Sequence, residues 1–192
     1  MSVLHRERVL RAATSSFLAR GYGSSVDDIA RRAGVAKQTV YQHFANKDEL
    51  FKAVAGDLAK RILIKLEGAG NQNEARQSLV RFGVEYRKRA LGAQGIAAFR
   101  TLVPEVPRFR ALARAMYANT AGELARRLAA YLGEAMAAGK LAPADPEFAA
   151  EMLLSMLAGQ DRIKRLFAVP AGENERVRTA QIVDCFLKAF RK

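Results

Sequence analysis

Two short apolar segments joined at a glycine constrain the fold of this chain more than any other feature. Residues 26–33 and 37–44 each carry apolar side chains at helical spacing. These side chains are Val26, Ile29, Ala30, Val40 and Phe44. Gly34 lies between the segments, and glycine favours the left-handed backbone that ends a helix sharply. Ser25 with Asp28 three residues later predicts an N-cap before the first segment, so we expect two short helices at a tight turn.

The rest of the sequence also favours helices. Ala, Leu, Arg and Glu dominate, and the chain has only five prolines among its 192 residues, so helix breakers are rare. We expect about nine helices, over 4–20, 26–33, 37–44, 47–66, 74–90, 93–103, 106–139, 146–168 and 175–190. Gly122 could kink the long seventh segment, and Asp145 before Pro146 predicts a capped start of the eighth. The fold class is therefore all-α.

The composition excludes several classes of protein. Half of the residues are apolar, which excludes a disordered chain. The single Cys185 excludes an internal disulfide, and together with the lack of a signal-peptide pattern it favours the cytoplasm. No apolar run is long enough to span a membrane. The net charge of +13 favours anionic partners, but it does not choose between nucleic acid and an anionic membrane surface.

The segment 26–44 has the layout of a helix-turn-helix, in which the second helix enters the major groove of DNA. Its outward side chains in the first turns are polar and suit base edges. They are Lys37, Gln38, Thr39 and Gln42. Tyr41, His43 and Lys47 suit phosphates, which set the register of a protein on DNA.

These residues resemble the N-terminal domain of TetR-family transcriptional regulators. The resemblance covers about residues 5–52 and rests on motifs at fixed spacing. They are Gly21-Tyr22, Ser25–Ala30, Gly34-Val35, Thr39–Phe44 and Lys47–Leu50. It implies DNA contacts by Thr39, Tyr41, His43 and Lys47, with Lys37 and Gln38 at more variable contact positions. Ala36 departs from the family, which often has a capping Ser there.

The later sequence resembles the AefR-like type of TetR ligand-binding domain, mainly in spacing and apolar character. We expect a DNA-binding domain over 1–45 (a three-helix bundle), a connecting helix over 46–67, and a ligand-binding and dimerisation domain over 68–192. The resemblance implies an inducer pocket among the middle helices, although aromatic and Met side chains there are as readily plain core. The candidate lining residues are Phe82, Tyr86, Phe99, Leu102, Met116 and Tyr117.

The last two helices carry more apolar residues than one stripe requires. The stretch 152–158 is apolar almost all round, which indicates burial on two sides. In the family, these helices of two subunits pair into a four-helix bundle, so we expect a homodimer. Its predicted interface is Leu153, Met156, Leu157, Ile163, Phe167, Ile182, Val183 and Phe186.

The resemblance implies a dimeric repressor that a small-molecule inducer releases from palindromic operator DNA. We expect no catalytic residues, no cofactor and no membrane partner, because the sequence carries no phosphate-binding loop and no nucleophile motif. A metal site is not expected either, since two histidines and one cysteine are too few for a zinc cage. The alternative function is a basic helical protein that binds nucleic acid or anionic lipid without sequence preference.

Overall fold

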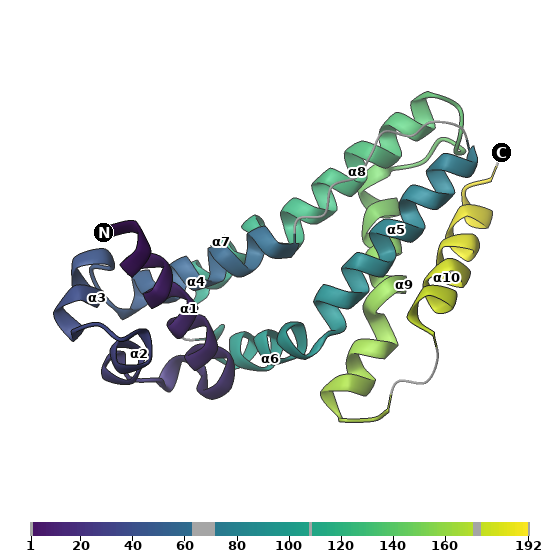
Figure 1. Cartoon of the computed structure of the whole chain (residues 1–192). Helices are drawn as coiled ribbons and strands as arrows, with labels where there is room; N and C mark the ends of the chain where they lie inside the picture. The colour runs from purple at the N-terminus through teal and green to yellow at the C-terminus, as the bar shows by residue number, and fades with distance from the viewer. Residues whose placement is uncertain (1, 63–71, 108, 171–173, 192) are drawn as a thin grey trace. The chain divides into compact units, whose positions relative to one another are not determined.

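The computed structural model describes residues 2–62, 72–107, 109–170 and 174–191, and all regular secondary structure in these ranges is helical. Figure 1 shows the helices in chain order. They are α1 (Ser2–Arg20), η1 (Gly21–Gly23), α2 (Val26–Ala33), α3 (Lys37–His43), α4 (Lys47–Ile62), α5 (Gln72–Leu91), α6 (Ala93–Leu102), η2 (Val103–Glu105), α7 (Arg110–Asn119), α8 (Ala121–Ala137), α9 (Pro146–Leu166) and α10 (Glu175–Ala189). The predicted all-α fold is confirmed.

The chain forms two compact units, each with its own hydrophobic cluster. The head unit comprises Met1–Arg61 with Ala97–Asn119, and the body unit comprises Ile62–Ile96 with Thr120–Lys192. Segment 97–119 thus packs with the N-terminal helices, although it lies far along the chain. The predicted end of the connecting helix near residue 67 lies outside the described residues.

The head unit is built around an aromatic centre. The Phe51 ring meets Phe17 edge-on with centroids 5.0 Å apart, and it meets Tyr22 in the same way at 5.2 Å. Phe109, from the later segment, lies 4.6 Å from the Tyr22 ring centroid. Leu112 of α7 is buried in the same cluster. The head unit therefore needs the 97–119 segment to cover its core.

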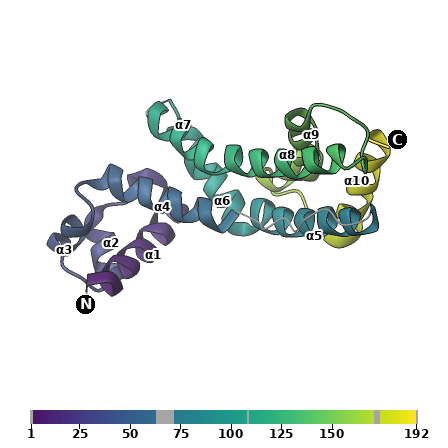
Figure 2. The ribbon, with the colours of Figure 1, turned by 90° about the horizontal axis from the view of Figure 1, so that it is seen from above.

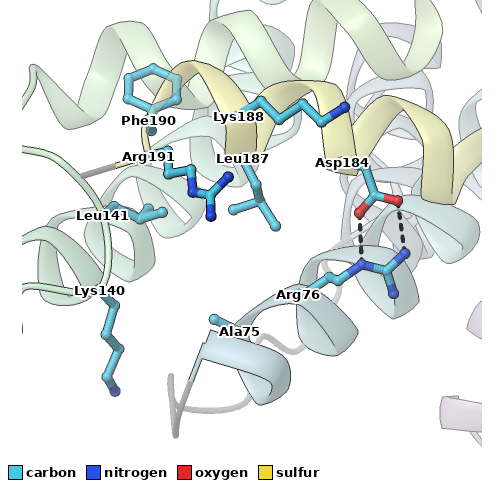
Figure 3. Close-up of a pocket in the computed structure, with 9 residues that line it drawn as sticks. All are labelled: Ala75, Arg76, Lys140, Leu141, Asp184, Leu187, Lys188, Phe190 and Arg191. Atoms are coloured by element: carbon cyan, nitrogen blue, oxygen red, sulfur yellow. Dashed lines mark hydrogen bonds and ion pairs between the residues drawn. The ribbon is translucent and has the colours of Figure 1, made fainter.

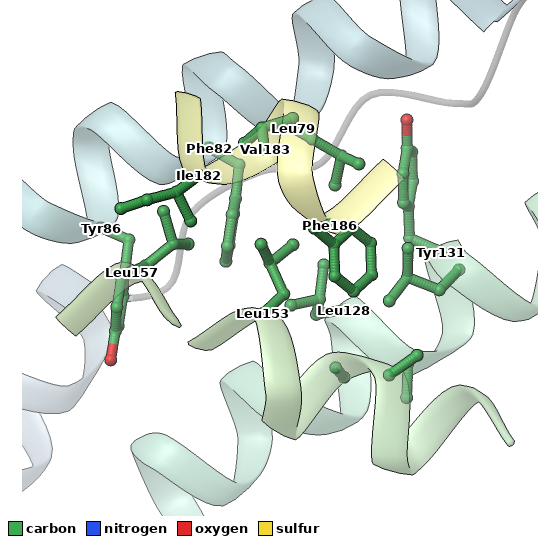
Figure 4. Close-up of a cluster of buried hydrophobic side chains, with 14 of the residues drawn as sticks. Leu79, Phe82, Tyr86, Leu128, Tyr131, Leu153, Leu157, Ile182, Val183 and Phe186 are labelled. Atoms are coloured by element: carbon green, nitrogen blue, oxygen red, sulfur yellow. The ribbon is translucent and has the colours of Figure 1, made fainter. Parts of the chain in front are cut away.

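The body unit packs α5, α8, α9 and α10 around a second cluster. α9 lies between α8 and α5, and α10 lies along α5; Figure 2 shows these four helices from above. Large side chains from all four are wholly buried, and Figure 4 shows many of them. They include Leu79, Phe82, Leu128, Leu132, Leu153, Leu157, Val183 and Phe186. Gly83 of α5 allows close packing here, because a Cβ atom at this position would lie 2.6 Å from Thr179 Cγ2.

Arg87 of α5 is a buried cation that joins three helices of the body unit. Its side chain is only 3% exposed. It donates to the Leu157 carbonyl oxygen at 2.6 Å, to Asp161 Oδ2 at 2.8 Å and to Glu175 Oε2 at 2.8 Å. Burial alone would raise the pKa of the Asp161 carboxyl, but the hydrogen bond and charge of Arg87 outweigh it and lower that pKa. A buried charge needs such partners, so α5, α9 and α10 are fixed relative to one another.

One predicted element is wrong. In place of a single helix over 106–139, the chain forms the two helices α7 and α8. The turn between α7 and α8 is at Thr120, whose φ of −122° and ψ of −95° are not helical, two residues before the expected kink at Gly122. The predicted helices over 146–168 and 175–190 agree with α9 and α10 to within two residues. No helix in the described ranges is both long enough and apolar enough to cross a membrane.

Replacing Arg87 with Met should lower the free energy of unfolding by about 2–4 kcal/mol, because Asp161 and the Leu157 carbonyl would lose a buried donor. Urea unfolding followed by circular dichroism measures this change. Arg89→Met is the matched control, since Arg89 pairs with Glu85 within one helix and is 33% exposed. The control should cost about 0.5 kcal/mol or less. Equal losses in the two variants would contradict the role given to Arg87.

Candidate nucleic-acid interface

The turn between α2 and α3 is fixed by backbone geometry and local hydrogen bonds. Gly34 has a left-handed φ of 63°, and its N–H donates to the carbonyl oxygens of Ala30 and Arg31. Ser25 Oγ accepts from the Asp28 N–H at 3.1 Å. The predicted N-cap and the predicted role of Gly34 are both confirmed. Hydrogen bonding with Ser25, together with the charges of Arg31 and Arg20, lowers the pKa of the Asp28 carboxyl.

Arg8 of α1 supports this turn from outside. Its guanidinium Nη2 donates to the Gly34 carbonyl oxygen at 3.4 Å. A Cβ atom on residue 34 would lie 2.5 Å from the same nitrogen. The end of the Arg8 side chain could move away, so the left-handed φ is the reason for glycine at position 34. Sequence reasoning missed this contact, because the two residues are 26 positions apart and no spacing rule connects them.

α3 presents one apolar face and one polar face. Val40 and Phe44 are buried in the head cluster, at 1% and 5% exposure, and the Arg6 guanidinium lies 5.3 Å from the Phe44 ring centroid. The predicted base-contacting and phosphate-contacting residues lie elsewhere on the helix. Lys37, Gln38, Tyr41 and Gln42 are exposed, whereas Thr39 and His43 are half-buried. The helix is therefore anchored on one side and leaves a polar face open.

Lys37 is held by an ion pair that the sequence did not predict. Its Nζ lies 2.9 Å from Asp27 Oδ2, at the start of α2. The hydrogen bond to Asp27, with the charge of that carboxylate, raises the pKa of the Lys37 ammonium. Both side chains are at least half exposed, so the pair orients Lys37 without burying it. A contact between two different helices has no signature in local spacing.

Lys47, the first residue of α4, is positioned by Tyr22. Its ammonium lies 4.4 Å from the Tyr22 ring centroid, which is a cation–π distance. The Tyr22 hydroxyl in turn donates to Asp48, and Asn46 caps α4 by accepting from the Glu49 N–H at 2.9 Å. Lys47 is half-buried in this arrangement. The sequence pointed to Lys47 itself but gave no role to Tyr22.

The six residues predicted to line a ligand pocket lie in different surroundings. Phe82 and Tyr86 belong to the body cluster, and their rings stack with centroids 6.1 Å apart. Leu102 and Met116 pack against the head cluster. Phe99 and Tyr117 are exposed, at 38% and 62%. Phe82 and Tyr86 thus lie together in the body unit, whereas the other four candidates belong to the head unit.

The residues predicted for the dimer interface divide into two groups. Five of them are buried inside the body unit of a single chain, so their predicted place at the subunit surface needs correction. These five are Leu153, Leu157, Ile182, Val183 and Phe186. Met156, Ile163 and Phe167 are exposed, at 37%, 46% and 78%. Only this second group is accessible to another chain, because the side chains of the first group are buried in the core of their own chain.

The chemistry of the open α3 face suits nucleic acid. Amide, hydroxyl and ammonium groups can pair with base edges and phosphates. The described residues contain no group of three or more His, Cys, Asp or Glu side chains that could hold a metal ion.

Two family models match the chain. Residues 9–54 match the family described as bacterial regulatory proteins of the tetR family, and residues 77–192 match the C-terminal domain of AefR-like transcriptional repressors. Curated relatives align with the N-terminal part. The activator FasR of Mycolicibacterium smegmatis is 50% identical over 50 residues, and the uncharacterised regulator YhgD of Bacillus subtilis is 39% identical over 70. The matched stretches span 26% and 36% of this chain, and 23% and 37% of those proteins.

Solved structures resemble the whole chain. The Flavonoid-responsive Regulator FrrA is 30% identical, with a TM-score of 0.79 over 97% of this chain and 94% of that one. A TetR-family regulator from Mesorhizobium loti has the same fold, with a TM-score of 0.83 at 22% identity over 99% of this chain and 98% of that one. The helix-turn-helix geometry, both family models and the likeness to FrrA agree, and the chain belongs to the TetR family of transcriptional regulators, with a C-terminal domain of the AefR-like type.

Proposed function

We propose that the chain is a homodimeric cytoplasmic repressor that binds a near-palindromic operator and is released by a small organic inducer. In this proposal residues 1–45 read DNA, residues 46–67 connect, and residues 68–192 bind ligand and dimerise. The observation that carries it is the polar open face of α3, opposite the anchors Val40 and Phe44. The AefR-like family model, which is described as a repressor domain, supports repression.

The head residues take two roles in this proposal. Lys37, Gln38, Thr39 and Gln42 contact base edges, since ammonium, amide and hydroxyl groups match the donors and acceptors of the major groove. Tyr41, His43 and Lys47 contact phosphates and set the position of α3. The Tyr22 ring beneath the Lys47 ammonium supports that role, because it limits where the charge can point.

A second copy of the chain is the proposed partner of the exposed face of α9. Apolar side chains form a stripe there at helical spacing, and the missing Cβ of Gly159 leaves open space within it. The stripe consists of Phe148, Met156, Ile163 and Phe167, with exposures between 37% and 78%. A two-fold axis would let this stripe meet its own copy, and each copy would then present one α3 to a half-site.

The inducer is proposed to bind among the middle helices, and of the predicted lining residues Phe82 and Tyr86 lie in the body unit. FrrA is, by its name, responsive to flavonoids, and the likeness over nearly both whole chains supports a small organic ligand here. A ligand shifts DNA affinity only if it prefers the conformation that does not fit DNA. A coupling of about 1–3 kcal/mol would change operator affinity roughly 5- to 150-fold.

A gel-shift experiment separates this proposal from non-specific binding by a basic helical protein. The probe is duplex DNA from upstream of the chain's own gene, and the competitor is excess random duplex. Retention of the probe complex supports an operator. Equal competition by any duplex would favour the non-specific alternative, and binding to anionic lipid vesicles in place of DNA would favour its membrane form.

Substitutions in the head should divide by role. Tyr41→Phe and Lys47→Gln should weaken binding to operator and random duplexes by a similar factor, because phosphates carry no sequence information. Gln38→Ala and Thr39→Ala should instead change base preference at single positions, by about 1–3 kcal/mol. Fluorescence anisotropy on an operator-variant panel measures both effects.

Arg114→Gln is the matched control for these substitutions, since it removes an exposed cation from α7 of the same unit. It should leave both affinity and preference unchanged. If all four head variants change affinity in the same way across the panel, the division into base-reading and phosphate-binding residues is wrong.

A charge placed on the α9 stripe should produce monomers. Met156→Glu and Ile163→Glu bury a carboxylate only when two copies associate, because both positions are exposed in the single chain. Analytical ultracentrifugation should show half the mass, while circular dichroism should show unchanged helix content. Ala130→Glu, at an exposed position of α8, should remain dimeric. A dimer in all three variants would place the interface elsewhere.

A further inference from the structure

We infer that the body unit binds a small amphipathic anion, a carboxylate or phosphate monoester on a short apolar group, in the cavity where α5 begins and α10 ends. The cavity has a volume of about 390 Å³. It lies within one unit and shares no residue with the six lining candidates for the inducer. Its walls come from the first turns of α5, the segment after α8 and the last turns of α10, as Figure 3 shows. They are formed by Ala75, Arg76, Lys140, Leu141, Asp184, Leu187, Lys188, Phe190 and Arg191.

The walls of this cavity are tied to one another. Arg76 of α5 makes a two-pronged ion pair with Asp184 of α10, from Nε to Oδ1 at 2.6 Å and from Nη2 to Oδ2 at 2.8 Å. On the other side, the Ala142 N–H donates to the Phe190 carbonyl oxygen at 2.8 Å. Both ends of the cavity are thereby braced before any ligand arrives, which reduces the entropy lost on binding.

The charge of the cavity selects an anion. Its lining has four cationic side chains and one carboxylate. That carboxylate, Asp184, is committed to Arg76, and the hydrogen bond from Arg76 lowers the pKa of Asp184, so the pair stays charged and mutually compensated. Lys188, whose charge also lowers the pKa of Asp184, and Arg191 line the same cavity from the end of α10. An anion placed beside these two cations would relieve their mutual repulsion.

Arg191 is the side chain best placed to hold the oxyanion. Figure 3 shows its guanidinium beside Leu187, on the side of the cavity opposite the ion pair of Arg76 with Asp184. No ion pair joins Arg191 to another of the described residues, and its planar guanidinium can bind a carboxylate or phosphate through two parallel hydrogen bonds. The residue is exposed, so its replacement leaves the core intact.

The floor of the cavity accepts an apolar group. Ala75, Leu141 and Phe190 are buried, at 6%, 7% and 8% exposure. Leu187 is half-buried and packs against the body cluster. The Phe190 ring continues into the core through Phe186, with centroids 4.8 Å apart. A short alkyl or aryl group on this floor would leave water while its anionic end stays among the cations. The volume is near the lower limit for ligand pockets, which restricts the ligand to a small molecule.

Isothermal titration calorimetry on the full-length, DNA-free protein tests the site, so its outcome does not depend on the proposed repressor activity. The probes are hexanoate and hexyl phosphate, with hexanol and inorganic phosphate as comparisons. Binding of either amphipathic probe, at least about tenfold tighter than both comparisons, supports the site, and the tighter probe identifies the headgroup. Absence of binding by both amphipathic probes would overturn it. Equal affinity for hexanol or for inorganic phosphate would overturn the requirement for both an anion and an apolar group.

Variants then assign the binding to this cavity. Arg191→Gln should weaken the bound probe about tenfold, because a charge-assisted hydrogen bond is replaced by a neutral one. Arg176→Gln removes an exposed cation from the other end of α10 and should leave the affinity unchanged. Equal weakening by the two variants, or none by Arg191→Gln, would show that the probe binds elsewhere and overturn the assignment.

Discussion

The buried guanidinium of Arg87 decides how the body unit is put together. Its three acceptors come from the middle of α9 and the first residue of α10. Leu157 and Asp161 are one helical turn apart, so this turn of α9 must face α5. The opposite side, with Gly159 and Ile163, is consequently turned to solvent. One buried cation with its three acceptors thus determines which surface of α9 is available to another chain.

Local signals in the sequence were sufficient for the boundaries of most helices. Gly34, Ser25 and Asp145 act on the backbone within a few residues of themselves, and each does what its spacing predicts. The expectation of one helix over 106–139 overlooked such a signal. Thr120 has Glu123 three residues later, which is the spacing of a capping box, and Thr120 is the N-cap residue of α8, although its side chain makes no cap hydrogen bond.

The division of α9 and α10 into inner and outer faces was not predictable in the same way. A stretch that is apolar almost all round indicates burial on two sides, but it does not say which side belongs to the chain's own core. Leu153 and Leu157 are buried against Phe186 and its neighbours, whereas Met156 is left outside. Arg87 was missed for a related reason, since a basic residue in a helix usually indicates a solvated position and its acceptors are 70 to 88 residues away. The open polar face of α3 was predictable, because the helical repeat of the sequence alone separates the apolar face of this helix from its polar face.

The ion pair between Lys37 and Asp27 bears on how DNA affinity would respond to ionic strength. A solvated lysine that reaches a phosphate releases about one condensed cation from the duplex. Lys37 is different, because its charge is already compensated by a carboxylate 2.9 Å away. When the Lys37 ammonium binds the duplex, Asp27 loses its partner and takes up a cation from solution. The net number of cations released at this position therefore falls to about zero. The salt dependence of operator binding would therefore indicate fewer released cations than there are cationic side chains in the interface.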